Sequence, residues 1–212
     1  GCKSLYSINI PKYISVSGIG NAAFAGCYSL AEVYNCSDYI KDMTIGSGSY
    51  GCVAGYAKVI HTDMSEASNI VRDGDYAMFK DGDKYILLGG CFEDKTSLVL
   101  PEIATSINAN AFYGNQKITS VTLGSNITAI CGNAFNGCYN LVEVVNKSNL
   151  NIVAGSSDNG YVAYYAQKVL IGEDEKGEVF NVGDYSFYKQ GGEYILYRYN
   201  GSDKELTLPG LI

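Results

Sequence analysis

Ile130-Cys-Gly-Asn-Ala-Phe135-Asn-Gly-Cys138-Tyr-Asn-Leu141-Val-Glu-Val144-Val-Asn146 is the stretch that decides the fold. Its pattern, I-x-x-x-A-F-x-G-C-x-x-L-x-x-V-x-N, recurs from Ile19 to Asn35 and, less exactly, from Ile107 to Leu123. Phe112 and Phe135 are 23 residues apart. A period of this size is typical of solenoids, in which each repeat contacts only its neighbours.

Short alternating segments precede the copies, and they predict strands with one buried face. The Ala-Phe pair of each copy predicts one helical turn that carries the phenylalanine into the core and is ended by the following glycine. We expect a single elongated coil with one continuous sheet, and buried phenylalanines at Phe24, Phe112 and Phe135. The residues predicted to stack inside it are Leu5, Ile8, Leu30, Val33, Ile118, Val121, Leu141 and Val144.

The combined pattern I-P-x-x-[VI]-x-x-I-x-x-x-A-F-x-G-C-x-x-L-x-x-[VI] covers about residues 1–35 and 95–146. It resembles the leucine-rich repeat of the BspA-like bacterial surface proteins. The resemblance implies an α/β, right-handed leucine-rich-repeat solenoid that is β-rich with short helical turns. It also implies an extracellular, cell-surface location and a role in adhesion.

Two irregular inserts, about residues 36–94 and 147–203, interrupt the regular repeats. They match each other at an offset of 109, as Asp75-Tyr76 and Asp184-Tyr185 show. The first predicts a β-hairpin from Tyr76 to Leu88 that turns at Asp81-Gly82. The second predicts a short helix over Val162–Val169, capped by Ser157 or Asp158.

We predict that the inserts continue the sheet, so that residues 1–212 form a single solenoid. Because the chain begins and ends inside a repeat, the sequence also indicates a fragment of a larger protein.

Composition excludes several classes of protein. The net charge is −7 and only 15 residues are Lys or Arg, which argues against a nucleic-acid partner, since a basic face would supply most of the affinity. No apolar run approaches the ~18 residues of a membrane span, so we predict no membrane insertion in this chain.

The seven cysteines are an odd number, so they cannot all pair within the chain. Cys2, Cys27 and Cys138 share one repeat position and are predicted to be free, buried thiols. Asn115 takes this position in a third copy, and it fits there if its amide bonds the backbone of the turn.

The sequence contains no catalytic constellation, and we predict a protein without enzymatic activity, cofactor or metal site. His61 is the sole histidine and lacks a second histidine or thiol at metal-ligand spacing. The Asp73-Gly-Asp75 and Asp81-Gly-Asp83 pairs lack the remaining positions of a calcium loop and fit turns instead.

Strand positions between buried residues predict a concave, solvent-facing strip. Its members are Glu32, Tyr34, Ser120, Thr122, Glu143 and Val145. Surfaces of this kind suit a macromolecular partner, here a host or bacterial surface protein bound by a monomer. Two alternatives stay open: the strip is merely solvated sheet, or the chain is a structural spacer in a larger surface protein and binds nothing itself.

Overall fold

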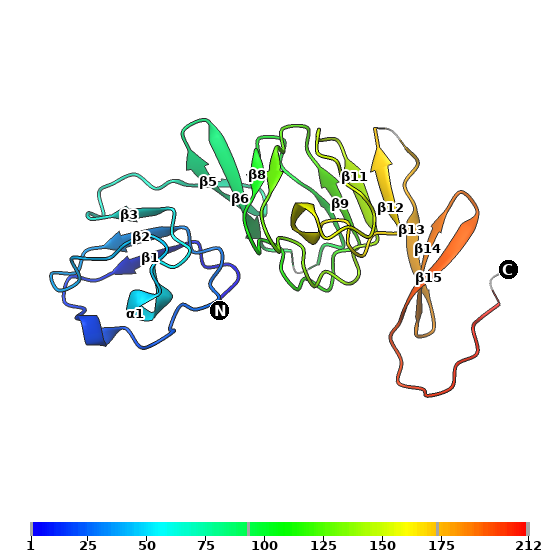
Figure 1. The fold of residues 1–212 in the computed structure, drawn as a ribbon, viewed down its shortest axis with the longest axis horizontal. Helices are drawn as coiled ribbons and strands as arrows, with labels where there is room; N and C mark the ends of the chain where they lie inside the picture. Colours follow the sequence, from blue (N-terminus) through cyan, green and yellow to red (C-terminus); the bar gives the residue numbers. More distant parts are fainter. Residues whose placement is uncertain (1, 93, 173, 211–212) are drawn as a thin grey trace.

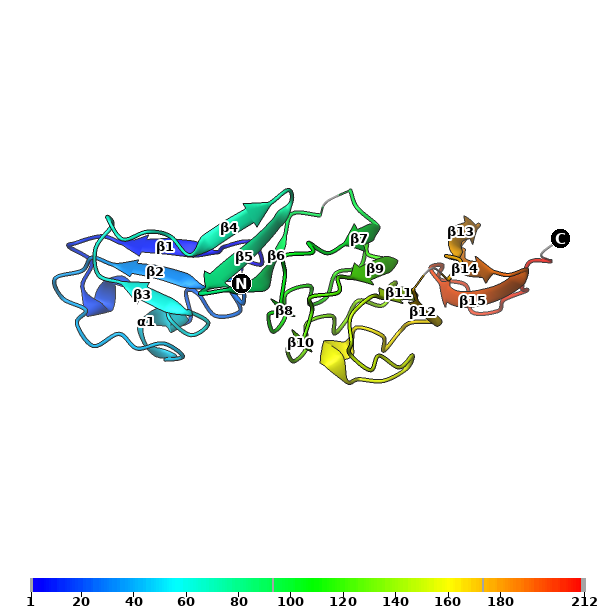
Figure 2. The same ribbon diagram turned by 90° about the horizontal axis from the view of Figure 1, so that it is seen from above.

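The computed structural model describes residues 2–92, 94–172 and 174–210. Figures 1 and 2 show an elongated molecule in which two coiled segments follow one another, each ending in antiparallel strands. We call the coils the first solenoid segment, residues 2–61, and the second solenoid segment, residues 97–171. The antiparallel strands after each coil are the first meander, residues 70–90, and the second meander, residues 178–199.

Each solenoid segment is built on a parallel sheet. The first sheet contains β1 (Ser7–Ile10), β2 (Glu32–Asn35) and β3 (Val59–His61). The second contains β7 (Ser97–Val99), β9 (Ser120–Leu123), β11 (Glu143–Asn146) and β12 (Lys168–Ile171). Apolar residues stand in register across the strands, as in the row Leu98, Val121, Val144 and Val169. The fold is therefore a leucine-rich-repeat solenoid that is mostly β.

Each meander has three antiparallel strands. They are β4 (Ile70–Asp73), β5 (Tyr76–Asp81) and β6 (Lys84–Gly90), then β13 (Glu178–Val182), β14 (Tyr185–Gln190) and β15 (Glu193–Tyr199). The predicted hairpin is confirmed, although Gly82 and Asp83 rather than Asp81 and Gly82 lie between the last paired residues. Strand β6 also pairs in parallel with β8 (Ser106–Ile107), which pairs with β10 (Ala129–Ile130). The expectation of one continuous sheet is wrong, because the first meander separates the two parallel sheets.

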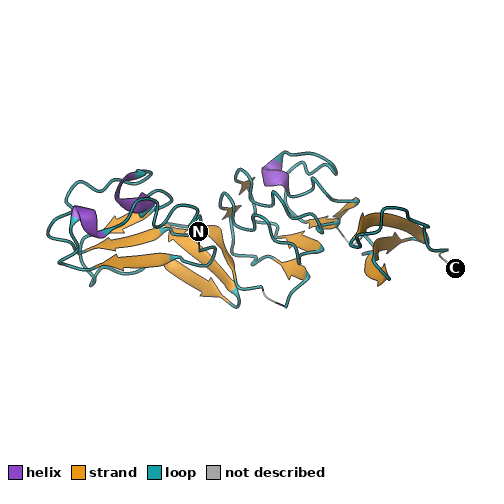
Figure 3. Cartoon of the chain, turned by 90° about the horizontal axis from the view of Figure 1, so that it is seen from below, coloured by secondary structure: helices purple, strands orange, loops and turns teal. Residues whose placement is uncertain are grey.

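The helical content is smaller than the sequence indicated. The described residues contain one α-helical piece, α1 (Ser49–Cys52), and two 3-10 pieces, η1 (Val16–Gly18) and η2 (Asn159–Tyr161). Figure 3 shows these pieces on the side of the coil away from the parallel sheets. The Ala-Phe segments are not helical, since they consist of successive tight turns entered through a residue with positive φ, such as Asn133 at 58°.

The helix predicted over Val162–Val169 is also wrong, because this part of the insert follows the path of another repeat. The N–H of Phe135 donates to the carbonyl of Gly160 at 2.8 Å, and the N–H of Phe24 donates to Gly51 at the same distance. The early part of each insert is thus one more turn of its coil, and only the later part forms a meander.

The core follows the predicted pattern most closely in the second solenoid segment. Phe112 and Phe135 are 3% and 0% exposed, and their rings stack with centroids 4.7 Å apart. Phe24 is only half-buried, so its prediction as a buried plug is wrong. Leu5 and Ile8 are half-buried as well, because β1 is the outermost strand of its sheet. The other residues predicted to stack inside are buried, each at most 1% exposed.

Asn115 replaces the repeat cysteine without loss of hydrogen bonding. Its Oδ1 accepts from the N–H of Lys117 at 2.8 Å and from the N–H of Ile118 at 3.2 Å. Cys138, at the same position of the next turn, lies with its Sγ 3.2 Å from the carbonyl oxygen of Phe112. The side-chain amide of Asn115 therefore accepts hydrogen bonds from the backbone of the turn, as its position in the repeat predicted.

All seven cysteines are free thiols. Cys27 and Cys138 are buried, but Cys2 is exposed like Cys91 and Cys131, so the burial predicted for Cys2 is wrong. We expect a thiol reagent to modify the three exposed cysteines in the folded protein. Cys27 and Cys138 should react only after unfolding, and burial further protects Cys138 by raising its pKa to about 11. Titration in denaturant should count seven thiols, and a lower count would contradict the prediction.

Candidate binding surface

The six residues of the predicted strip lie in two different sheets. Ser120 faces Glu143 and Thr122 faces Val145 across β9 and β11, whereas Glu32 and Tyr34 lie on β2. The expectation that the strip faces solvent is wrong, because Ser120 is half-buried and the other five are at most 8% exposed. The following contacts show which segments cover its two glutamates.

Glu32 anchors the start of the first meander. Its side chain is 1% exposed, and its carboxylate accepts from the N–H of Asn69 and the hydroxyl of Ser68, both at 2.8 Å. These two donors immediately precede β4. Burial alone would raise the pKa of Glu32, but hydrogen bonds from Asn69, His61 and Ser68 lower it below its ordinary value.

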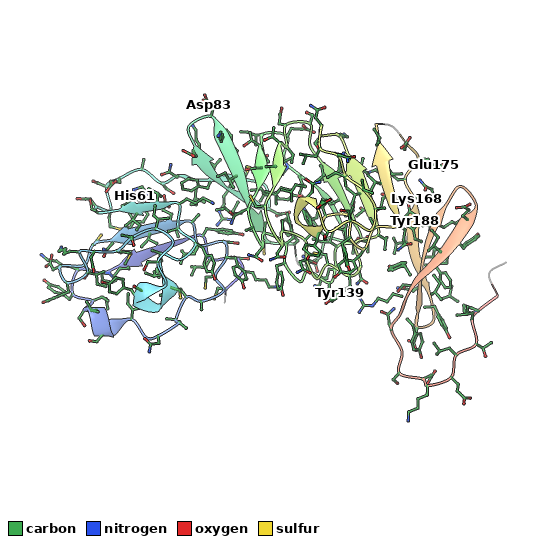
Figure 4. The ribbon with its side chains drawn as sticks, viewed as in Figure 1. His61, Asp83, Tyr139, Lys168, Glu175 and Tyr188 are labelled. Carbon is green, nitrogen blue, oxygen red and sulfur yellow. The ribbon has the colours of Figure 1, made fainter. Side chains whose placement is uncertain are left out.

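His61 sits between two carboxylates. Its Nε2 lies 3.0 Å from Glu32 Oε1 and its Nδ1 lies 3.1 Å from Glu66 Oε2, while the ring stacks on Tyr34 with centroids 4.4 Å apart. Burial lowers the pKa of His61, but the two glutamates raise it by more, so the net pKa lies above the ordinary value. The His61 ring ties β3, where Figure 4 labels His61, to the loop that enters the first meander.

In the second half of the chain, Glu143 links the parallel sheet to the second meander as Glu32 does in the first half, but with different partners. Its Oε2 accepts from the N–H of Gly177 at 2.7 Å and from the hydroxyl of Tyr188 at 2.9 Å, next to the second meander. Burial and then the Glu143 carboxylate raise the pKa of Tyr188, which lies on β14 and is labelled in Figure 4. Leu170 stands 109 residues after His61, so this copy has no imidazole.

Two groups of aromatic rings, half-buried or exposed, lie at turns of the two coils. We call them together the tyrosine edge; it consists of Tyr28, Tyr56, Tyr113, Tyr139, Tyr164 and Tyr165. Tyr28 and Tyr56 meet edge to face with centroids 5.0 Å apart, and Tyr139 and Tyr165 repeat this pair at 5.0 Å.

Three members of the tyrosine edge are strongly exposed: Tyr113 is 42% exposed, Tyr139 55% and Tyr164 44%. Figure 4 labels Tyr139 at the rim of the second solenoid segment. Sequence reasoning missed this surface. The sequence signal that could have revealed it is the recurrence of tyrosine directly after Cys27 and Cys138, within a chain of 19 tyrosines.

A family model for the BspA type leucine rich repeat region matches six copies over residues 1–52 and 89–158, more than half of the chain. The chain belongs to the BspA-type leucine-rich repeat family. The matched BspA-type repeats cover most of both coils, and the unmatched residues include the second meander and nearly all of the first. The glutamates that hold the meanders, however, lie within the matched repeats.

Other comparisons add little to the BspA-type assignment. A leucine rich cell surface protein from Faecalibacterium prausnitzii A2-165 is similar in structure at 11% sequence identity and a TM-score of 0.21. The similarity covers 69% of this chain and 66% of that protein's chain, slightly less than two thirds of its length. A similarity this weak carries no argument here. No curated protein matches the sequence.

Two structural features of this BspA-type chain bear on its chemistry. Among the described residues, no group of three His, Cys, Asp or Glu side chains is placed to hold a metal ion. None of the helices in the described part of the chain has the length and apolarity needed to cross a membrane.

Proposed function

We propose that this chain is a non-enzymatic binding module at the cell surface, where a monomer presents its solenoid to a host or bacterial surface protein. Membership of the BspA-type family supports a surface repeat protein. The observation that carries the binding role is the tyrosine edge, because its ring pairs occur in both halves of the chain and three of its members, Tyr113, Tyr139 and Tyr164, are exposed.

The chemistry of the tyrosine edge suits a protein partner. Tyrosine covers a large area at a low cost in conformational entropy, and it is enriched among residues that dominate binding energy. The edge-to-face pairs fix the rings before binding, so less freedom is lost when a partner arrives. Because Glu32 and Tyr34 are buried, we place the contacts with the partner on the exposed tyrosine rings.

Binding to extracellular-matrix and bacterial-surface proteins tests the proposal. We expect the Tyr139→Ala, Tyr164→Ala double variant to bind the partner on the order of 30-fold more weakly or worse, since central aromatic residues often contribute 2 kcal/mol or more. Tyr13→Ala is the matched control, because Tyr13 is 79% exposed but lies outside the tyrosine edge. An equal loss in both variants would remove the tyrosine edge as the binding surface.

A structural spacer is the second candidate function. It is favoured by the burial of the concave strip, since Glu32 and Glu143 are occupied in joining sheets to meanders. Failure of this chain to bind any partner, combined with binding by a longer form of the protein, would establish the spacer role.

A further inference from the structure

The space between sheet and meander is filled differently in the two halves of the chain. In the first half, an apolar cluster fills part of it, formed by Tyr6, Ala31, Ala77, Phe79 and Leu88. Their repeat equivalents in the second half are Thr119, Val142, Ser186, Tyr188 and Tyr197. The equivalence is structural as well, because Ala31 donates its N–H to Tyr6 as Val142 does to Thr119.

This exchange of apolar for polar residues leaves a groove in the second half. Two adjoining cavities of ≈ 340 and ≈ 380 Å³ share Thr96, Thr119 and Val179 in their walls, and we call them together the polar groove. The second cavity is lined by Ser186 and Tyr197, whose equivalents Ala77 and Leu88 belong to the apolar cluster of the first half. The first half also has a hollow of ≈ 460 Å³ at the entry of its meander, lined by Tyr6 and Arg72.

A relay of hydrogen bonds orients two amides in the polar groove. Asn200 Nδ2 lies 2.8 Å from Ser186 Oγ, and Ser186 Oγ lies 2.8 Å from Asn181 Oδ1. With Ser186 accepting from Asn200 and donating to Asn181, Asn181 keeps its Nδ2 donors and Asn200 its Oδ1 acceptor for a ligand. All three residues line the groove.

The fold does not require this relay. Arg72, Ala77 and Cys91 occupy the equivalent positions in the first half, where no such relay can form because Ala77 has no hydroxyl. The first meander nevertheless has the same strands and pairing as the second. A feature that the architecture does not need, and that removes apolar packing, indicates a role in binding.

The remaining lining is also rich in neutral hydrogen-bonding groups. Ser97 and Ser120 are joined by a hydroxyl–hydroxyl bond of 2.7 Å, and Asn140 is held by Arg198 at 2.6 Å. Among the described lining residues Lys176 is the one basic side chain, which disfavours phosphorylated ligands. Polar side chains predominate among the lining residues, which disfavours lipids, since apolar ligands need predominantly apolar walls.

We infer that the polar groove binds a neutral oligosaccharide. Adjacent hydroxyls of a sugar both donate and accept hydrogen bonds, which matches the donor of Asn181 and the acceptor of Asn200. Tyr197 adds aromatic surface beside them. The polar groove uses no residue of the tyrosine edge. It is therefore a second binding site, and failure of one proposal leaves the other unaffected.

The test applies the full chain to an array of neutral glucan, mannan, galactan and N-acetylglucosamine oligomers, followed by calorimetry with the best of them. We expect at least one oligomer to bind, and Asn181→Ala to weaken binding about tenfold or more through loss of a donor. Asn126→Ala is the control, because Asn126 is an exposed asparagine outside the groove. This variant should bind the oligomer with the same affinity as the unaltered chain.

A second variant fills the polar groove with the side chains found at the equivalent positions in the first half of the chain. Thr119→Tyr with Ser186→Ala installs the residues that Tyr6 and Ala77 provide there, and it should abolish binding. Asn181 is exposed, so Asn181→Ala decides the question by itself if the filled variant does not fold. Absence of binding to every oligomer, full affinity in Asn181→Ala, or competition by an extended peptide rather than by sugars would each overturn the inference.

Discussion

Replacement of Phe135 by alanine should lower the free energy of unfolding by about 3–5 kcal/mol. The side chain is completely buried and stacks on Phe112, which in turn lies 5.6 Å from the Phe92 ring. Removal of the ring leaves a cavity in a stacked column that neighbouring turns cannot fill, because the backbone hydrogen bond from Phe135 to Gly160 fixes their spacing. Urea denaturation of the purified variant measures the loss.

Phe24→Ala is the matched control, since Phe24 occupies the same repeat position but is only half-buried. It should cost clearly less than Phe135→Ala. A loss below about 1 kcal/mol for Phe135→Ala, the level of unremarkable substitutions, would show that the phenylalanine column does not support the core.

Replacement of Glu32 by alanine should cost a similar amount, about 3–5 kcal/mol, between about pH 4.5 and 6.5. The variant leaves a buried imidazolium with one carboxylate fewer and removes the acceptor of Ser68 and Asn69. Because deprotonation of His61 relieves part of this penalty, the cost should fall as the pH rises. Glu143→Ala is the control: its partners Gly177 and Tyr188 are uncharged, so its cost should not follow the titration of a histidine.

The pH dependence of the unaltered chain follows from the same network. The folded pKa of His61 lies above its ordinary 6.5, so its stabilisation is complete below that value and is lost as the pH rises through the folded pKa. Hydrogen bonds from Thr62, His61 and Asp63 lower the pKa of Glu66 to about 2, so its contribution is present above 4.5 and is lost toward pH 2.

We therefore expect the network to contribute most between about pH 4.5 and 6.5. Urea midpoints measured across the acid and alkaline ranges should show this maximum for the unaltered chain. Identical pH profiles for the Glu32→Ala and Glu143→Ala variants would contradict the proposed network.

The regular coil could be predicted from sequence because its signals are local. The spacing of Phe112 and Phe135, and the alternation before them, report on residues that contact their immediate neighbours. The hairpin from Tyr76 to Leu88 was equally local. Phe24 and Leu5 were misjudged because burial at the end of a coil depends on how many turns pack beside it, which the motif does not encode.

The strip could not be predicted, because its covering comes from distant parts of the chain. Glu32 looks like an exposed strand residue until Ser68 and Asn69, more than 30 residues later, fold back on it. The polar groove has the same origin, since it arises from a difference between two repeats at Tyr6 and Thr119. Comparison of the two halves of the chain position by position, rather than as similar blocks, would have shown that difference in the sequence.

The stacking of strands along the length of the molecule also determines how it would respond to a pulling force. Strands that lie across the direction of pull separate one after another, so a load on the two ends would peel the coil turn by turn. A repeat of 23 residues occupies about 4.8 Å while folded and about 75 Å when drawn straight. Each released turn would thus become many times longer than it is when folded, so under load the chain would extend in steps and would not behave as a stiff rod.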